Sequence, residues 1–179
     1  MHLPPDSLFE QPQDGAEIHT GIRLGRGWHL ESLSDHTDGD TGAAAAAPAW
    51  PLWSRSPRAT LHVSAVHFPE PVPLRLSLQA CAASPGHPVT LSISSPGHPP
   101  LTRQITGPTV LRIATPHHPA GAASSSITFE LSDFASPLLL GRGTDPRQLG
   151  LGLTGLAPRW PLRARLRARL HALLAARRG

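Results

Sequence analysis

Hydrophobic and polar residues alternate with a period of two along most of the chain from position 59 onward. Because successive side chains of a β-strand point to opposite faces, this pattern predicts strands with one buried face. The alternation is clear at 59–65, 74–79, 89–94 and 127–132. Shorter segments with the same pattern are found at 101–105, 109–113 and 149–153.

The connections between these segments are rich in Pro and Gly, as in FPEPVP, SPGHP and TGP. No amphipathic stretch of about ten residues separates consecutive strands, and such a helix is needed to connect parallel strands. The sequence therefore predicts an all-β domain over 21–158, an antiparallel β-sandwich of jelly-roll type. The near-repeat of Ser84–Pro88 at Ser95–Pro99 is interpreted as two similar turns that bound one strand.

Three other segments differ from the strand region. Residues 1–20 are acidic and show no sustained period, so we interpret them as a flexible leader. Residues 34–50 combine acids, Gly and five consecutive Ala, and we interpret them as a low-complexity loop inside the domain. Residues 159–179 repeat Leu at helical spacing between arginines, which predicts a basic amphipathic helix that begins near Pro161.

The charge of the chain is polarised. The formal net charge is +4, but residues 1–40 hold eight acids against two Arg, and the segment from 142 onward holds nine Arg against one acid. The basic character thus belongs to the C-terminal helix, whose Leu stripe has to be buried against something. We expect it to contact a protein partner or an anionic membrane surface, and no nucleic-acid motif accompanies the arginines. The candidate contact residues are Arg163, Leu166, Arg167, Leu170 and Leu174.

Composition excludes several kinds of chemistry. The chain contains no Lys and no Tyr, which removes lysine-dependent phosphate binding, Schiff-base chemistry and tyrosine acid–base catalysis. Its lone cysteine, Cys81, can form neither an intrachain disulfide nor a cysteine-based zinc site, which favours a reducing compartment. Without a signal-peptide pattern or a long apolar run, we expect a cytoplasmic protein, peripheral to the inner membrane if the helix binds lipid.

Some sequence motifs resemble catalytic or cofactor-binding motifs, but the neighbouring residues or elements that such sites require are missing. Gly150–Gly155 matches GxGxxG, but no βαβ unit surrounds it, and Pro158 would stop the helix that it should open. The 11 His show no metal-ligand spacing, and the acids near Asp38 lack the rest of a calcium loop. No pair of carboxylates is supported for glycoside hydrolysis. We therefore predict no enzyme, no metal and no cofactor.

The four tryptophans leave two interpretations open. An exposed indole can stack on a sugar ring, because its flat apolar face matches the C–H face of a pyranose, whereas a buried indole belongs to the core. The core interpretation is favoured for Trp28, and the two are balanced for Trp53.

Several segments together resemble small β-sandwich domains that accompany bacterial polysaccharide and lipopolysaccharide glycosyltransferases. The opening Gly25–Glu31 resembles the "GW…E" start of that family, and Trp53-Ser54 its Trp-Ser step. Phe129–Pro137, Gly141 and Asp145–Leu153 resemble its ending, "SP…LG…D-x-R-x-LG-L-x-L". The resemblance covers about 22–157, although the spacer between Glu31 and Trp53 is longer than in the family.

The resemblance implies a non-catalytic accessory or carbohydrate-binding-like domain in bacterial surface-polysaccharide biosynthesis, with a glycan or a glycosyltransferase as partner. The ligand-contact residues that we predict are Trp28, Glu31, Trp53, Asp145 and Arg147. Asp145-Pro146-Arg147 also fits a turn in which Arg147 pairs either with Asp145 or with backbone carbonyls before the next strand, and this architectural interpretation is the stronger one. The alternative function is a structural or interaction protein attached to a partner or membrane through its C-terminal helix.

Overall fold

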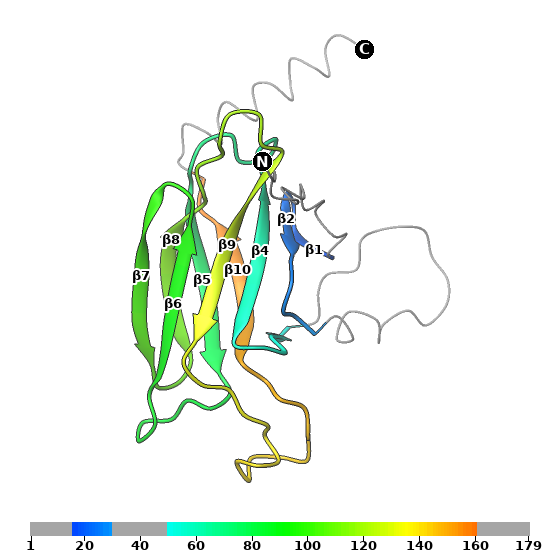
Figure 1. Cartoon of the computed structure of the whole chain (residues 1–179), viewed down its shortest axis with the longest axis vertical. Helices are drawn as coiled ribbons and strands as arrows, with labels where there is room; N and C mark the ends of the chain where they lie inside the picture. The colour runs from blue at the N-terminus through cyan, green and yellow to red at the C-terminus, as the bar shows by residue number, and fades with distance from the viewer. Residues whose placement is uncertain (1–15, 30–49, 161–179) are drawn as a thin grey trace, which may run out of the picture.

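Two antiparallel sheets make up the part of the chain that the computed structural model describes, residues 16–29 and 50–160 (Figure 1). The six-stranded sheet has the order β1 (Glu17–His19), β2 (Ile22–Leu24), β4 (Arg58–Ser64), β9 (Ser124–Leu131), β6 (Val89–Ser95) and β7 (His98–Ile105). The four-stranded sheet has the order β3 (Leu52–Trp53), β10 (Leu151–Pro158), β5 (Pro73–Ala80) and β8 (Thr109–Ala114). The predicted antiparallel sandwich is confirmed.

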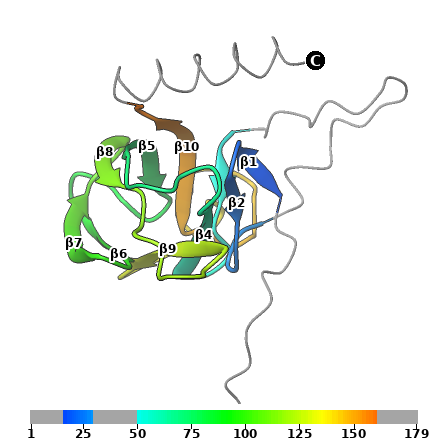
Figure 2. The ribbon, with the colours of Figure 1, turned by 90° about the horizontal axis from the view of Figure 1, so that it is seen from above.

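The chain crosses between the two layers at every step from β3 to β10 except one. The exception is the hairpin of β6 and β7, which lie side by side in one sheet. Eight strands that alternate between sheets in this way have the connectivity of a jelly roll. Figure 2 shows the two layers from above, with β8, β5 and β10 on one side and β7, β6, β9 and β4 on the other.

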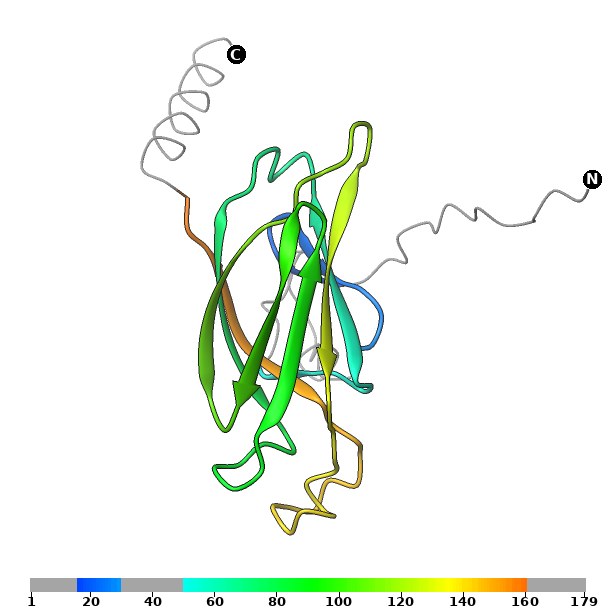
Figure 3. The same cartoon turned by 60° about the vertical axis from the view of Figure 1, so that its left-hand side comes forward.

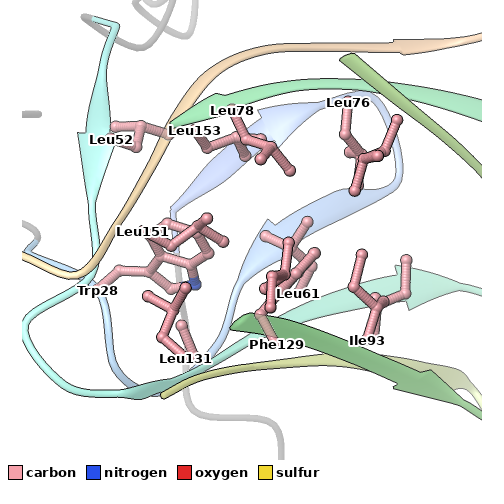
Figure 4. Packing of buried hydrophobic residues seen from close by; sticks show 14 of the residues in the cluster. Trp28, Leu52, Leu61, Leu76, Leu78, Ile93, Phe129, Leu131, Leu151 and Leu153 are labelled. Atoms are coloured by element: carbon pink, nitrogen blue, oxygen red, sulfur yellow. The ribbon is translucent and has the colours of Figure 1, made fainter. Parts of the chain in front are cut away.

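The core fills the space between the sheets, as the period of two predicts. Leu61, Ile93 and Phe129 point inward from the six-stranded sheet, toward Leu76 and Leu78 of the other (Figure 4). All five are at most 4% exposed. Complete burial of such a side chain contributes about 1.5–3 kcal/mol, so this layer is the main source of stability.

The structure differs from the sequence expectations at three places. Strand β1 already pairs with β2 inside the segment interpreted as a leader, and Ile18 is buried. The two-residue strand β3 had no periodic signal. Phe68, in a Pro-rich connection, is buried and stacks on Trp160 at a ring separation of 5.2 Å.

The predicted C-terminal helix lies outside the described residues, together with its candidate contact residues from Arg163 to Leu174. Glu31 and nearly all of the 34–50 loop also lie outside them. Within 16–29 and 50–160, no helix is long and apolar enough to cross a membrane.

Trp28 is a core residue. Its side chain is 2% exposed and meets the ring of Phe129 edge-on, with the ring centroids 6.4 Å apart. Its indole Nε1–H donates a hydrogen bond to the Thr60 carbonyl at 2.7 Å, so the polar atom is also satisfied. Because neither ring face is accessible, we correct the expectation that Trp28 contacts a ligand.

We expect Trp28→Ala to lower the free energy of unfolding by about 3–5 kcal/mol, since it leaves a cavity beside Phe129 and removes the indole hydrogen bond to the Thr60 carbonyl, which keeps only its bond from the Gly25 N–H. The matched control is Trp50→Ala, because Trp50 is 36% exposed. It should cost less than about 1 kcal/mol. Urea unfolding of both variants measures the difference, and equal losses would contradict the assignment of Trp28 to the core.

Candidate functional site

The Trp-Ser step and the "LG-L" ending lie side by side, because β3 pairs with the start of β10. Ser54 is fully buried at this junction. Its Oγ accepts a hydrogen bond from the Leu151 N–H at 2.8 Å and donates one to the Ser56 carbonyl at 3.0 Å. Its backbone exchanges two further hydrogen bonds, with the Leu151 carbonyl and the Gly150 N–H. Ser54 therefore fastens the very short β3 onto β10.

The "GW" opening reaches the same corner of the sandwich. Trp28 forms a bridge with Ser54, and the His29 N–H donates to the Trp53 carbonyl at 2.8 Å. The His29 ring atom Nε2 lies 3.3 Å from the Gln148 carbonyl. Gly27 has a φ of +90°, and a Cβ there would collide with the Arg58 carbonyl, so the turn requires glycine. Three motifs that are distant in sequence thus meet at one corner.

Trp53 lies on the outer surface of the four-stranded sheet. Its neighbour Leu52 points into the core, so the indole points outward, over its cross-strand partner Gly152. A Cβ built on Gly152 would lie 2.7–2.9 Å from three adjacent atoms of the six-membered ring. Nearly equal distances to adjacent atoms place Gly152 against the face of the ring. One face of the half-buried indole is therefore covered by β10.

The side chains next to Trp53 on this surface are small or polar. Burial alternates along β5, so that Arg75, Ser77 and Gln79 point outward, and Val110 and Arg112 do so on β8. On the intervening β10, the partners of Gln79, Ser77 and Arg75 are Gly152, Gly155 and Ala157. We call this surface the outer face. Its members are Trp53, Arg75, Ser77, Gln79, Val110, Arg112, Gly152, Gly155 and Ala157.

Asp145 and Arg147 belong to the long connection between β9 and β10, which extends beyond the ends of the strands (Figures 1 and 3). The Arg147 N–H donates to Asp145 Oδ1 at 2.9 Å, and its Nη2 donates to Oδ2 at 2.8 Å. Of the two partners that the sequence left open for Arg147, Asp145 is confirmed. The Asp145 carbonyl also accepts from the Leu138 N–H at 3.0 Å, so the pair holds the shape of the loop.

The electrostatics of this loop agree with an architectural role. The side-chain hydrogen bond from Arg147, followed by that from its backbone, lowers the pKa of Asp145 to about 2. Arg142 donates to the carbonyls of Cys81 and Ala83 at 3.0 and 3.1 Å, which ties the loop to the end of β5. Burial raises the pKa of the Cys81 thiol, which therefore stays protonated at neutral pH.

Two other described carboxylates lie beside basic side chains. Glu130 lies 3.4 Å from Arg58, and Asp133 lies 2.8 Å from the ring of His87. Across residues 16–29 and 50–160, no three His, Cys, Asp or Glu side chains are grouped as a metal ion would require.

No family model matches this chain, and no curated protein matches it. Among solved structures, it is similar to a family GH115 4-O-methyl-α-glucuronidase with specificity for decorated arabinogalactans, at a TM-score of 0.35 and 11% sequence identity. The match covers 65% of this chain and spans 15% of the length of that enzyme.

The structure does not bring the side chains of the described predicted contact residues together on one surface. Trp53 is on the outer face, Trp28 is in the core, Asp145 and Arg147 lock a loop, and Glu31 lies outside the described residues. Ser77, Gln79, Arg75 and Arg112 were not among the predicted contact residues. The alternation of the strands could have indicated them, because it places these polar residues on the face opposite the core.

We expect Gly152→Ala to destabilise the protein by about 1–3 kcal/mol, because the new methyl group pushes the Trp53 indole off β10. In a Trp53→Ala background the same substitution meets no ring and should cost less than about 0.5 kcal/mol. Denaturant unfolding of the four proteins of this double-mutant cycle gives both values. Additive losses would show that the indole does not lie on Gly152.

The Asp145 carboxyl should titrate near pH 2 in an NMR experiment, well below its ordinary 3.8, because Arg147 stabilises the charged form. Since folding lowers this pKa, the contribution of the pair to stability is present above about pH 4 and is lost as the pH falls toward 2. Arg147→Gln should return the midpoint toward 3.8. An unchanged midpoint in that variant would refute the assigned cause.

Proposed function

We propose that this sandwich is a non-catalytic accessory domain that contacts glycan through its outer face. The observation that carries the proposal is the position of Trp53, with one ring face against Gly152 and the indole only half-buried. A ring supported in this way is held parallel to the sheet before a ligand arrives, which lowers the entropic cost of stacking on a sugar.

The residues beside the indole support the same use. Gln79 is the register partner of Gly152, and Ser77 is the register partner of Gly155. An amide and a hydroxyl next to an aromatic platform provide the hydrogen-bonding groups that fix the orientation of a polar ligand. The small side chains of β10 leave room for a ring to approach the sheet.

The non-catalytic part of the proposal is supported by the described carboxylates. Glu130, Asp133 and Asp145 are engaged by Arg58, His87 and Arg147, respectively. None of the three is an outer-face residue, so a sugar ring on Trp53 would not lie between two of these carboxylates as glycoside hydrolysis requires.

The sequence resemblance to domains that accompany bacterial glycosyltransferases supports the biological setting. We propose that the domain works in surface-polysaccharide biosynthesis, where it holds glycan for a transferase or positions the transferase on it. In this setting the fold displays a surface, and the bond-making step belongs to the partner.

Binding of the full chain to a glycan array tests the proposal. The wild type should bind a subset of glycans, and Trp53→Ala should weaken that binding about tenfold or more through loss of the stacking surface. Trp53→Phe retains a smaller ring and should keep part of the affinity. Trp50→Ala, which removes an exposed indole before β3, is the control and should bind normally.

Two outcomes would overturn the proposal. One is a wild-type protein that binds no glycan on the array. The other is a Trp53→Ala protein that is folded by thermal unfolding and binds as well as the wild type.

A further inference from the structure

Two arginines face each other on the outer face, at the opposite end from Trp53. Arg75 of β5 is the direct register partner of Arg112 of β8. Both side chains are exposed, and each lies between inward-pointing neighbours such as Leu74, Leu76 and Leu111. The two guanidinium groups therefore project from the same side of the sheet as the indole of Trp53.

A third arginine extends this group. The Arg159 N–H donates to the Pro73 carbonyl at 2.7 Å, which continues the pairing of β10 with β5 by one residue. Because Ala157 pairs with Arg75 on the outer face, the alternation returns Arg159 to that same face. Arg159 is exposed, whereas the next residue, Trp160, packs against Phe68.

No ion pair balances these positive charges within the described part of the chain. Neither Arg75 nor Arg112 forms an ion pair with any of the five described carboxylates, and none of those carboxylates is an outer-face residue. Like charges directly opposite each other on antiparallel strands destabilise a sheet. The arrangement is thus unfavourable for folding and becomes favourable when an anion binds between the guanidinium groups.

The distance between the arginines and the indole fits an extended ligand. Trp53 lies over Gly152, whose partner on β5 is Gln79, and Arg75 is four positions further along the same strand. At the rise of a β-strand, this is a separation of about 13 Å. Gln79 is level with Gly152, and Ser77 lies between Gln79 and Arg75. A chain of a few sugar rings spans this length, whereas a single ring does not.

We propose that the outer face selects acidic glycans, with Arg75, Arg112 and Arg159 binding carboxylate groups while Trp53 stacks on a ring further along the chain. This inference rests on the proposed function and names its substrate class. The planar guanidinium fork matches a carboxylate in a bidentate geometry, which gives Arg its advantage at such a site. A single-stranded nucleic acid fits less well, because stacking successive bases needs aromatic side chains among the cations and Trp53 is the one aromatic residue of the outer face.

Calorimetric titration of the full chain with oligogalacturonate, and with neutral galacto-oligosaccharide of equal length, tests the inference. The wild type should bind the acidic ligand about tenfold more tightly, and Arg75→Gln and Arg112→Gln should each remove most of that preference. Arg103→Gln is the control matched in charge, because Arg103 is exposed on β7 of the other sheet. It should keep the preference.

Thermal unfolding separates loss of recognition from loss of fold. Because each substitution relieves the repulsion between Arg75 and Arg112, both Gln variants should unfold at the same temperature as the wild type or higher while binding the acidic ligand more weakly. A residue with only a structural role would not combine weaker binding with unchanged or greater stability.

Three results would overturn the inference. Equal affinity for the two oligosaccharides, unaffected by Arg75→Gln, would remove the acidic preference and leave the proposed glycan contact intact. If the protein binds neither oligosaccharide and no glycan on the array, both the acidic preference and the proposed glycan contact are wrong. Binding of a single-stranded oligonucleotide as tightly as oligogalacturonate, with the same dependence on Arg75, would show a general polyanion surface instead.

Discussion

The junction of β3 with β10 is the constraint on which the rest of the site depends. A strand of two residues has too few ladder hydrogen bonds to hold its position alone, and the buried side chain of Ser54 provides the missing one through the Leu151 N–H. The junction places the Trp53 indole against Gly152. It also places Ser54 where Trp28 can form a bridge with it. The Trp28, Trp53-Ser54 and Leu151 segments, which carry the resemblance, thus stabilise this corner of the sandwich through their contacts with one another. The surface that we propose for binding is the outer face beside them.

The two sheets handle charge in different ways. On the six-stranded sheet, Arg58 of β4 faces Glu130 of the neighbouring β9, an exposed pair that adds little stability but leaves no net charge. On the four-stranded sheet, Arg75 faces Arg112, and neither forms an ion pair with a described acid. A facing pair of arginines is thus found on the four-stranded sheet, where the six-stranded sheet has a facing arginine and glutamate. Our interpretation of the outer face follows from this asymmetry together with the supported indole.

The sequence predicted features that depend on local pattern. The period of two located β4, β5, β6 and β9. The sequence also predicted a locked turn at Asp145–Arg147, with Asp145 as one of two possible partners of Arg147, and the structure has that pairing. The sequence favoured the core for Trp28 and left Trp53 undecided, and it predicted both as ligand contacts. Neither residue lies in an alternating segment that would have fixed the direction of its side chain. The sequence analysis did not predict strand β3 or the burial of Phe68. Neither lies in an alternating segment, and each is held by tertiary contacts, β3 by β10 and Phe68 by Trp160. The opposition of Arg75 and Arg112 depends on the register between β5 and β8, which no local pattern specifies. The role of the predicted C-terminal helix stays a prediction.

The central claim is that ligand binds on the outer face of the four-stranded sheet. Backbone and indole NMR shifts of the labelled full chain, followed during titration with oligogalacturonate, test this claim most directly. We predict that the shift changes cluster at the Trp53 indole and at the amides of Ser77, Gln79, Arg75 and Arg112, while β6 and β9 of the other sheet stay unchanged. Changes confined to the six-stranded sheet or to the Asp145–Arg147 loop would contradict it.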